Sequence, residues 1–142
     1  MASERIAHAI FAFSSPGADA FPEDKARTIA LARLMNEQAA VYTRLFPQKF
    51  NFMAVVPLPY TQEAIVEARY ALDHLGASGI ALLSNFEGTY LGDPSFRLFF
   101  QAVDNFGGSQ IVFIHPNTPY LKFNGRLVEA NPTVYQTGII EF

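Results

Sequence analysis

Gln110-Ile-Val-Phe-Ile-His115-Pro116 is a run of apolar residues that ends in one histidine and a proline. Its β-branched and aromatic residues predict a strand, and Pro116 predicts the point where that strand stops. In parallel α/β folds the active site is built at the carboxyl ends of the strands. His115 therefore stands where such a fold places functional side chains, and a neutral imidazole can serve there as a metal ligand or as a general base.

Three similar apolar runs precede this strand, and segments of helical periodicity lie between them. Strands are predicted over residues 6–13, 50–56, 79–83 and 110–114, the first as a buried strand, and helices over 22–45, 61–75 and 93–106. This alternating order predicts a parallel sheet with right-handed crossovers. Two architectures fit it: an open doubly wound sheet, or consecutive units of a β/α barrel.

The helices carry end signals and apolar faces. Pro22 suits the first turn of the first helix, Thr61 suits the cap of the second, and Gly76 is a candidate left-handed C-cap. Residues predicted to face the core are Ile29, Ala32, Leu34, Ala40, Ile65, Ala68, Leu72, Leu75, Phe96, Phe99, Phe100 and Val103. Residues 84–92 and most of the chain after Pro116 are expected to be loop, with residues 138–142 extended.

Length and composition limit the class of protein. The 142 residues predict a single domain, residues 1–142, which is short of the roughly 250 that a closed eight-stranded β/α barrel needs. Half of the residues are hydrophobic and the net charge is −3, so the chain offers no basic surface for nucleic acid or for an anionic membrane. It has no cysteine, which excludes a disulfide framework and a thiolate metal site. Without a signal peptide or a long apolar run, we expect a cytoplasmic protein.

The chain has two further histidines, and neither is a strong candidate for function. His8 falls within the first predicted strand, which favours a hydrogen-bonded core histidine. His74 lies near the end of the second helix and is expected to face solvent. No other His, Asp or Glu stands at metal-ligand spacing from any of the three histidines, whereas a catalytic zinc site usually needs three protein ligands.

The segment Asn85-Phe-Glu-Gly-Thr-Tyr90 could present an amide, two aromatic rings and a carboxylate to a flat organic ligand. An ordered loop with a turn at Gly88 is the plainer alternative. Ser14-Ser15-Pro16-Gly17 lies at the same predicted edge and is more typical of a plain turn than of an anion site. Glu63 and Glu67 are expected to be solvated neighbours on one helix.

Five segments together resemble the amidohydrolase-related decarboxylases, the relatives of aminocarboxymuconate-semialdehyde decarboxylase. In chain order they are Ser14-Ser-Pro-Gly17, Phe46-Pro-Gln-Lys-Phe50, Leu75-Gly-Ala-Ser-Gly-Ile80, Ser84-Asn-Phe-Glu-Gly-Thr-Tyr-Leu-Gly-Asp-Pro94 and Val112-Phe-Ile-His-Pro116. The longest segment is most similar to decarboxylases of the 6-methylsalicylate type. The resemblance covers nearly the whole chain.

The resemblance implies a fold and a chemistry. The fold would be part of a distorted (β/α)8 barrel, about four consecutive β/α units, and the family's single divalent metal is zinc or manganese. His115 would be the metal ligand on a middle strand, and Ser14, Asn85, Phe86 and Tyr90 would face the substrate. The remaining metal ligands and the catalytic histidine would lie before Met1 and after Phe142, so the chain is expected to be a truncated form and inactive alone.

The implied reaction is the nonoxidative loss of CO₂ from a small aromatic or unsaturated carboxylic acid such as 6-methylsalicylate. Two alternatives stay open: a metal-dependent hydrolase of the same superfamily, and a non-catalytic binding module built from the half-barrel. An open-sheet ligand-binding domain is a third. A partial barrel leaves strand edges unpaired, so we expect a homo-oligomer or a chain that aggregates.

Overall fold

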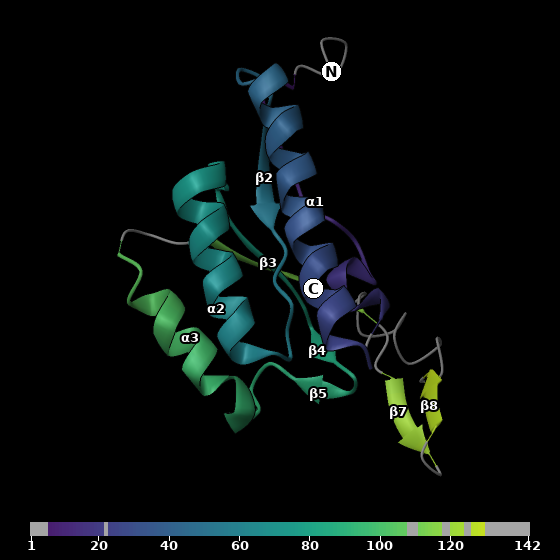
Figure 1. Ribbon diagram of the computed structural model, residues 1–142. Helices are drawn as coiled ribbons and strands as arrows, with labels where there is room; N and C mark the ends of the chain where they lie inside the picture. Colours follow the sequence, from purple (N-terminus) through teal and green to yellow (C-terminus); the bar gives the residue numbers. More distant parts are fainter. Residues whose placement is uncertain (1–5, 22, 108–110, 118–119, 124–125, 130–142) are drawn as a thin grey trace.

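The computed structural model of the protein describes residues 6–21, 23–107, 111–117, 120–123 and 126–129. Its central feature is a four-stranded parallel sheet (Figure 1). The strands follow one another in space as they do along the chain: β1 (Ala9–Phe11), β2 (Phe50–Ala54), β3 (Gly79–Leu83) and β6 (Ile111–His115). A doubly wound sheet reverses its strand order at a switch point, and this order does not reverse. The prediction of consecutive β/α barrel units is therefore confirmed.

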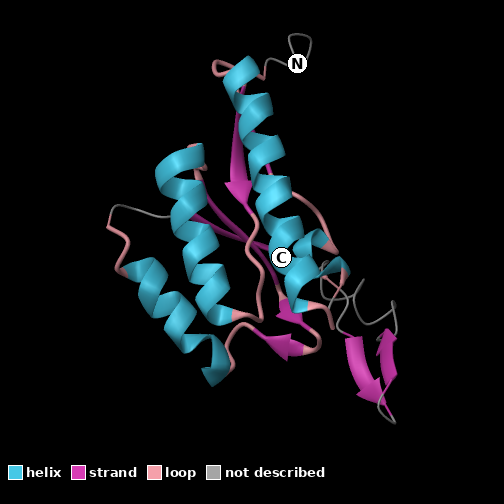
Figure 2. Ribbon diagram, in the orientation of Figure 1, coloured by secondary structure: helices cyan, strands magenta, loops and turns pink. Residues whose placement is uncertain are grey.

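Helices connect the strands and cover one face of the sheet (Figure 2). They are α1 (Lys25–Leu45), α2 (Thr61–Tyr70), which continues into a π-helical turn at Ala71–Leu75, and α3 (Arg97–Asp104), which follows a 3₁₀ turn at Pro94–Phe96. The largest core cluster packs β3 against α2 and α3; its members include Val56, Leu58, Ile80, Leu82, Phe96 and Phe99. A second cluster packs α1 against β2 through Ala39, Ala40, Phe52 and Ala54.

The helix ends differ from the prediction at two positions. The first helix begins at Lys25 instead of Pro22, because the Asp24 carboxylate caps it by accepting a hydrogen bond from the Arg27 N–H at 3.0 Å. Thr61 is the first residue of α2, and Tyr60 stands at the cap position. Gly76 ends the second helix with a φ of 76°, as predicted.

The core face of α1 also differs from the prediction at Leu34. The residues that α1 buries are Thr28, Ala32, Asn36, Ala39 and Ala40, mostly spaced by four. Leu34 lies two residues from Ala32 and from Asn36, so it projects from the opposite side of the helix and is exposed. Ala32 and Ala40 are fully buried, as predicted.

The two outer strands are more exposed than the sequence predicts. β3 is buried throughout, but Ile10 on β1 is 51% exposed, so the prediction of a buried first strand is wrong. On β6, Ile111 to Ile114 are all exposed. The reason is position in the sheet, because among the described strands β1 pairs only with β2 and β6 only with β3.

Two short hairpins replace segments that were expected to be loop. β4 (Asn85–Phe86) and β5 (Thr89–Tyr90) are antiparallel, and so are β7 (Tyr120–Phe123) and β8 (Arg126–Glu129). The sequence between β7 and β8 is Asn-Gly, a strong hairpin signal that the sequence reading missed. The prediction for residues 138–142 lies outside the described residues. Among the described residues, none of the helices combines the length with the hydrophobicity that a membrane span requires.

Candidate functional site

The carboxyl ends of the four parallel strands form one rim of the sheet, and most of the predicted site residues lie along it. Ser14 follows β1, Asn85 begins the segment after β3, and His115 is the last residue of β6. In the β3–β6 register, His115 stands beside Leu83. The parallel topology therefore brings the turn after β1, the β4–β5 hairpin and His115 to the same edge.

His115 sits at this rim with its ring partly exposed. Its Nδ1 lies 2.7 Å from the carbonyl oxygen of Pro116. A carbonyl oxygen only accepts, so the hydrogen bond requires Nδ1 to carry a proton, and in the neutral imidazole Nε2 is then the nitrogen with a lone pair. This tautomer can donate that lone pair to a metal ion or accept a proton.

The residues around His115 do not complete a metal site. Among the described residues there is no group of three His, Cys, Asp or Glu side chains that could hold a metal ion. His115 can thus supply one ligand of the three that a catalytic zinc site usually takes from protein.

A buried amide network holds the two loops beside His115 together. The Ser84 hydroxyl donates to Asn117 Oδ1 at 2.8 Å, Asn85 Nδ2 donates to the Asn117 carbonyl oxygen at 3.1 Å, and Asn117 Nδ2 donates to the Asn85 carbonyl oxygen at 3.1 Å. Asn85 is fully buried, and its Oδ1 accepts from the Gly88 N–H within the hairpin. The network fixes the β4–β5 hairpin to the segment that follows His115.

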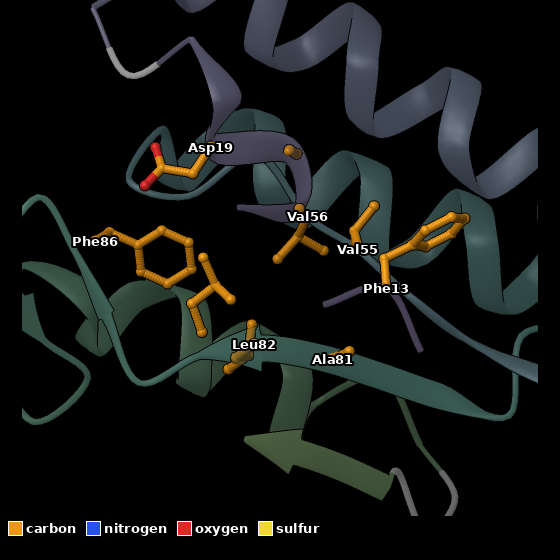
Figure 3. Close-up of a pocket in the computed structure, with 10 residues that line it drawn as sticks. Phe13, Asp19, Val55, Val56, Ala81, Leu82 and Phe86 are labelled. Carbon is orange, nitrogen blue, oxygen red and sulfur yellow. The ribbon is translucent and has the colours of Figure 1, made fainter. Parts of the chain in front are cut away.

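A small cavity of about 20 Å³ lies among the turn after β1, the segment after β2 and the end of β3. Most of its lining is apolar and comes from Phe13, Gly17, Ala18, Val55, Val56, Ala81, Leu82, Leu83 and Phe86. Asp19 is the one ionisable residue that lines it. Figure 3 shows Asp19 and Phe86 at one end of the cavity and Phe13 at the other. A space of this size holds roughly one water-sized group.

Asp19 is in an unfavourable environment for a charged carboxylate. It lies in the 3₁₀ turn Gly17–Ala20, and its Oδ1 is buried with no hydrogen-bond partner among the described residues. Burial, and then the negative charge of Glu87, raise the pKa of Asp19 to about 7. Glu87 is held at the tip of the β4–β5 hairpin with a φ of 49°. Near neutral pH, Asp19 is therefore present in both its charged and its neutral form.

Tyr60 belongs to the same electrostatic neighbourhood. Burial and the charges of Glu87, Asp19 and Asp24 raise the pKa of its hydroxyl, while Lys25 lowers it. Lys25 pairs with Glu63 at the start of α2 and lies 5.6 Å from the centre of the Tyr60 ring. The charged side chains around the Asp19 end of the cavity therefore carry a net negative charge.

The predicted site residues are not all brought together. Phe86 lines the cavity, whereas Ser14, Asn85, Tyr90 and His115 do not. Ser14 and Tyr90 are exposed on the rim. The sequence reading did not single out Asp19 or Asn117. Their positions in the sequence could have indicated them, because each follows the end of a predicted strand: Asp19 comes after the turn that follows β1, and Asn117 stands two residues after His115.

His8 and Glu67 differ from the prediction in their exposure to solvent. His8 precedes β1 and is exposed, with its Nδ1 3.3 Å from the Gln48 carbonyl oxygen, so the prediction of a core histidine is wrong. The reason is that β1 begins only at Ala9. Glu67 is buried instead of solvated, because it accepts hydrogen bonds from Arg33 and Asn36, both at 2.8 Å. His74 is exposed, as predicted, and its ring lies 5.6 Å from that of Tyr70.

Comparison with known proteins shows similarity to decarboxylases along nearly the whole chain. The decarboxylase yanB of Aspergillus niger is 33% identical over 140 residues, which are 96% of this chain and 38% of that protein. The 6-methylsalicylic acid decarboxylase of Penicillium expansum is 33% identical over 118 residues, 81% of this chain and 36% of that protein. The chain thus spans between a third and two fifths of the length of these relatives. No family model matches it.

A solved structure shares the fold. The 5-carboxyvanillate decarboxylase LigW2 from Novosphingobium aromaticivorans superposes with a TM-score of 0.74 and is 28% identical; the match covers 80% of this chain and 32% of that one. That enzyme was crystallised with bound manganese and 3-methoxy-4-hydroxy-5-nitrobenzoic acid. The matched part of this chain therefore corresponds in fold to about a third of that enzyme.

Proposed function

Because this chain belongs to the amidohydrolase-related decarboxylase family, we propose that it forms part of an enzyme that removes CO₂ nonoxidatively from a small aromatic carboxylic acid. A 6-methylsalicylate-like acid is the proposed substrate class. The observation that carries the proposal is the position of His115 at the carboxyl end of β6, with Nδ1 within hydrogen-bond distance of the Pro116 carbonyl oxygen.

A divalent metal, zinc or manganese, is the proposed cofactor, and His115 is the proposed ligand from this chain. The bound manganese of the carboxyvanillate decarboxylase supports a divalent metal. The described residues do not form a complete metal site by themselves, because no group of three candidate ligands occurs among them. We therefore expect the 142-residue chain alone to release no CO₂.

The reaction replaces the bond from the ring carbon to the carboxylate by a bond from that carbon to hydrogen. The bond between the ring carbon and the carboxylate breaks, its electron pair stays on the ring carbon, and a proton takes the place of CO₂. The rim offers aromatic and polar groups that suit a flat acid. Ser14, Asn85, Phe86 and Tyr90 are the proposed substrate-binding residues, with Asn85 acting through the hairpin that it holds in place.

The role of His115 can be tested on the chain as it stands, because each of its three histidines gives its own ring signals in an NMR spectrum. On titration with Zn²⁺, the His115 ring signals should shift at a lower metal concentration than those of the exposed His8 and His74. Equal response of the three rings would contradict a metal role for His115.

The decarboxylation itself requires the rest of the barrel. A chimera in which this chain replaces the matching segment of the Penicillium expansum 6-methylsalicylic acid decarboxylase should release CO₂ from 6-methylsalicylate. In this chimera, His115→Asn removes the proposed metal ligand and should lower the rate of CO₂ release by about 100-fold or more. His74→Asn is the matched control and should leave the rate unchanged. A folded chimera whose rate does not depend on His115 would refute the proposal.

We also propose that this chain associates with itself. The supporting observation is the row of exposed apolar side chains on β6, from Ile111 to Ile114, beside a strand edge that pairs with nothing in the described residues. Such an edge favours pairing with another strand. Sedimentation velocity should show species larger than a monomer, increasing with concentration.

A further inference from the structure

We propose that the outer face of α1 is an interface that packs, in antiparallel orientation, against α1 of a second copy of this chain. The face is formed by Leu34, Gln38, Val41 and Leu45, and we call it the α1 stripe. α1 is the longest helix of the described residues (Figure 1). The contact is separate from the one proposed for β6, and it does not depend on the proposed function, because no residue of the stripe lines the cavity or follows a strand end.

The outer face of α1 is more apolar than that of the other two helices. Leu34 is 54% exposed, Val41 is 45% exposed and Leu45 is 64% exposed. A helix that packs on a sheet normally carries polar residues on its solvent side. α2 and α3 follow this rule, since each exposes a single large apolar side chain, Val66 and Leu98 respectively. The apolar side chains of the α1 stripe therefore form a continuous surface that a partner can cover.

The residues of the α1 stripe are spaced as in a coiled coil. They follow one another at intervals of four, three and four residues, which is the alternation of d and a positions in a heptad. This spacing keeps the four side chains on one side of the helix, over about 16 Å of its length. The buried face of α1, which includes Asn36, Ala39 and Ala40, lies on the opposite side and packs on the sheet. The stripe is thus free to interlock with a second helix.

The charges beside the stripe favour an antiparallel partner. Glu37 and Arg44 flank the stripe on the same side, at successive g positions of the heptad, and these positions set the orientation of a helix pair. An antiparallel pair that places Leu34 opposite Leu45 of the second copy also places Glu37 opposite Arg44 of the second copy. The two-fold axis repeats this ion pair at the other end. A parallel pair would instead place Glu37 opposite Tyr42.

Glu37 and Arg44 are available for these ion pairs. Both are exposed, and neither takes part in the ion pairs that the described residues form. The Glu37 carboxylate accepts one hydrogen bond from the exposed Tyr70 hydroxyl, at 3.3 Å, which leaves its other oxygen free for Arg44 of the second copy. Within one helix, Glu37 and Arg44 are about 10 Å apart along the axis, too far to pair with each other.

Gln38 supports the same register. In the antiparallel pair it lies opposite Val41 of the second copy, so the two Gln38 side chains occupy adjacent layers beside the two-fold axis. Each amide can there donate a hydrogen bond to the other. A single polar residue in an apolar seam selects one register at a cost in stability. Because one helix face takes part, we expect a weak dimer with a Kd of about 10–100 µM.

The first experiment uses the full chain carrying Phe113→Lys, which removes the contact proposed for β6. Sedimentation velocity of this protein should show a reversible equilibrium between monomer and dimer. Adding Leu34→Lys should weaken the dimer by about tenfold or more, because it places a charge where a leucine packs in both halves of the interface. Adding Leu98→Lys is the matched control, since this leucine on α3 is 59% exposed, and the equilibrium should stay unchanged.

The second experiment tests the antiparallel register through charge. Glu37→Arg and Arg44→Glu should each weaken the dimer by about fivefold or more at low salt, because like charges then face each other at both ends of the seam. An equimolar mixture of the two variants should recover the dimer, because each contact again joins opposite charges. No contact within one chain can produce this recovery. Circular dichroism checks that every variant folds, and the mixture decides the matter if Leu34→Lys does not fold.

Three outcomes would overturn the interface. The first is a monomer at every concentration up to about 500 µM in the Phe113→Lys protein, which would mean that α1 is covered by another molecule or by none. The second is an equal response to Leu34→Lys and Leu98→Lys. The third is a mixture of the two charge variants that dimerises no better than each variant alone. None of these measurements involves CO₂ release, so an inactive chimera would leave the α1 interface in place.

Discussion

The pKa of the Asp19 carboxyl group is set by the position of this residue in the fold. The turn after β1 carries it over an apolar cavity, and the β4–β5 hairpin, distant in sequence, brings Glu87 toward it. Burial and the like charge both disfavour the ionised form, so its pKa rises from 3.8 to about 7. The consequence is a carboxyl group that changes charge near neutral pH.

This titration predicts how stability depends on pH. The pKa of Asp19 is higher in the folded protein than in the unfolded chain, so the folded state holds the extra proton between about pH 4 and pH 7. The free energy of unfolding therefore falls as the pH rises through this window. Asp19→Asn removes the ionisable group, and it should be more stable than the wild type at pH 8 by about 1–2 kcal/mol, a value reduced for solvent screening.

Urea unfolding at acidic and at mildly alkaline pH checks this expectation. The two proteins should differ little near pH 4 and diverge as the pH rises. Asp104→Asn, at an exposed position, should follow the wild type at every pH. Parallel curves for Asp19→Asn and the wild type would show that Asp19 ionises normally.

Asn36 is the residue on which a second buried polar cluster depends. Its side chain bonds to both backbone groups of Val55, donating to the carbonyl oxygen at 2.8 Å and accepting from the N–H at 2.9 Å. It also donates to Glu67 Oε1, and Glu67 Oε2 accepts from Arg33 Nε. The guanidinium of Arg33 lies over the Tyr70 ring at 3.7 Å. The cluster joins α1, α2 and the segment after β2.

Asn36→Ala should destabilise the fold more than its size suggests. It leaves the N–H and carbonyl of Val55 and one oxygen of Glu67 buried without their partners, each at a cost of roughly 1–3 kcal/mol. We expect a loss of about 3 kcal/mol or more in the free energy of unfolding, measured by urea denaturation. Gln38→Ala, at an exposed position of the same helix, should cost less than about 0.5 kcal/mol. Equal costs for the two variants would contradict the role of Asn36.

At the scale of elements, the contact between β3 and β6 depends on a glycine. Gly79 is buried at the start of β3 and stands beside Ile111 in the register. A Cβ atom at Gly79 would collide with the carbonyl oxygen and the Cβ of Ile111. The absence of a side chain at Gly79 therefore lets β6, and with it His115, reach its place in the sheet.

Gly79→Ala should loosen β6 specifically. The added methyl group meets backbone atoms that can yield only by moving the strand, so we expect a loss of about 1–3 kcal/mol in the free energy of unfolding. Relative to the wild type, amide hydrogen exchange in Gly79→Ala should become faster in β6 and change less in β2. Gly92→Ala is the matched control, because a Cβ at Gly92 meets nothing within 4 Å. Unchanged exchange in β6 would show that the strands can absorb the methyl group.

The elements also show which local signals can be trusted. Asp24 and Asp93 cap helical turns, and Gly76 ends one, because capping depends on residues close in sequence. The exposure of Ile10 and Phe113 was not predictable from their apolar character. It depends on whether a neighbouring strand or layer covers them, which periodicity does not report.

At the scale of the whole molecule, the four parallel strands of the described residues form a sheet that does not close on itself, with exposed apolar residues on one outer strand. On β6, Phe113 is 43% exposed and Ile114 is 53% exposed. In a closed barrel each strand has neighbours on both sides, so such an edge would be covered. The exposed edge supports the proposal that copies of this chain associate.

Phe113→Lys should weaken that association. A lysine on an edge strand opposes strand pairing, and removing a phenylalanine that becomes buried on association should weaken self-association by about tenfold or more. Sedimentation velocity over a range of concentrations measures this change. Val66→Lys, which replaces an exposed apolar residue on α2, should leave the distribution of species unchanged. Identical behaviour of the two variants would place the contact elsewhere.

The order of strands and helices, the end of the second helix at Gly76 and the position of His115 at a strand end follow from the sequence alone, because each depends on residues within a turn or a strand of one another. The cavity, the raised pKa of Asp19, the burial of Glu67 and the amide network around Asn117 depend on segments about 30 to 70 positions apart. Only the folded sheet brings those segments into contact. Burial and charge act through space. The burial of Glu67 and the pKa of Asp19 are therefore set by neighbours that are distant in the sequence, and spacing along the chain does not reveal them.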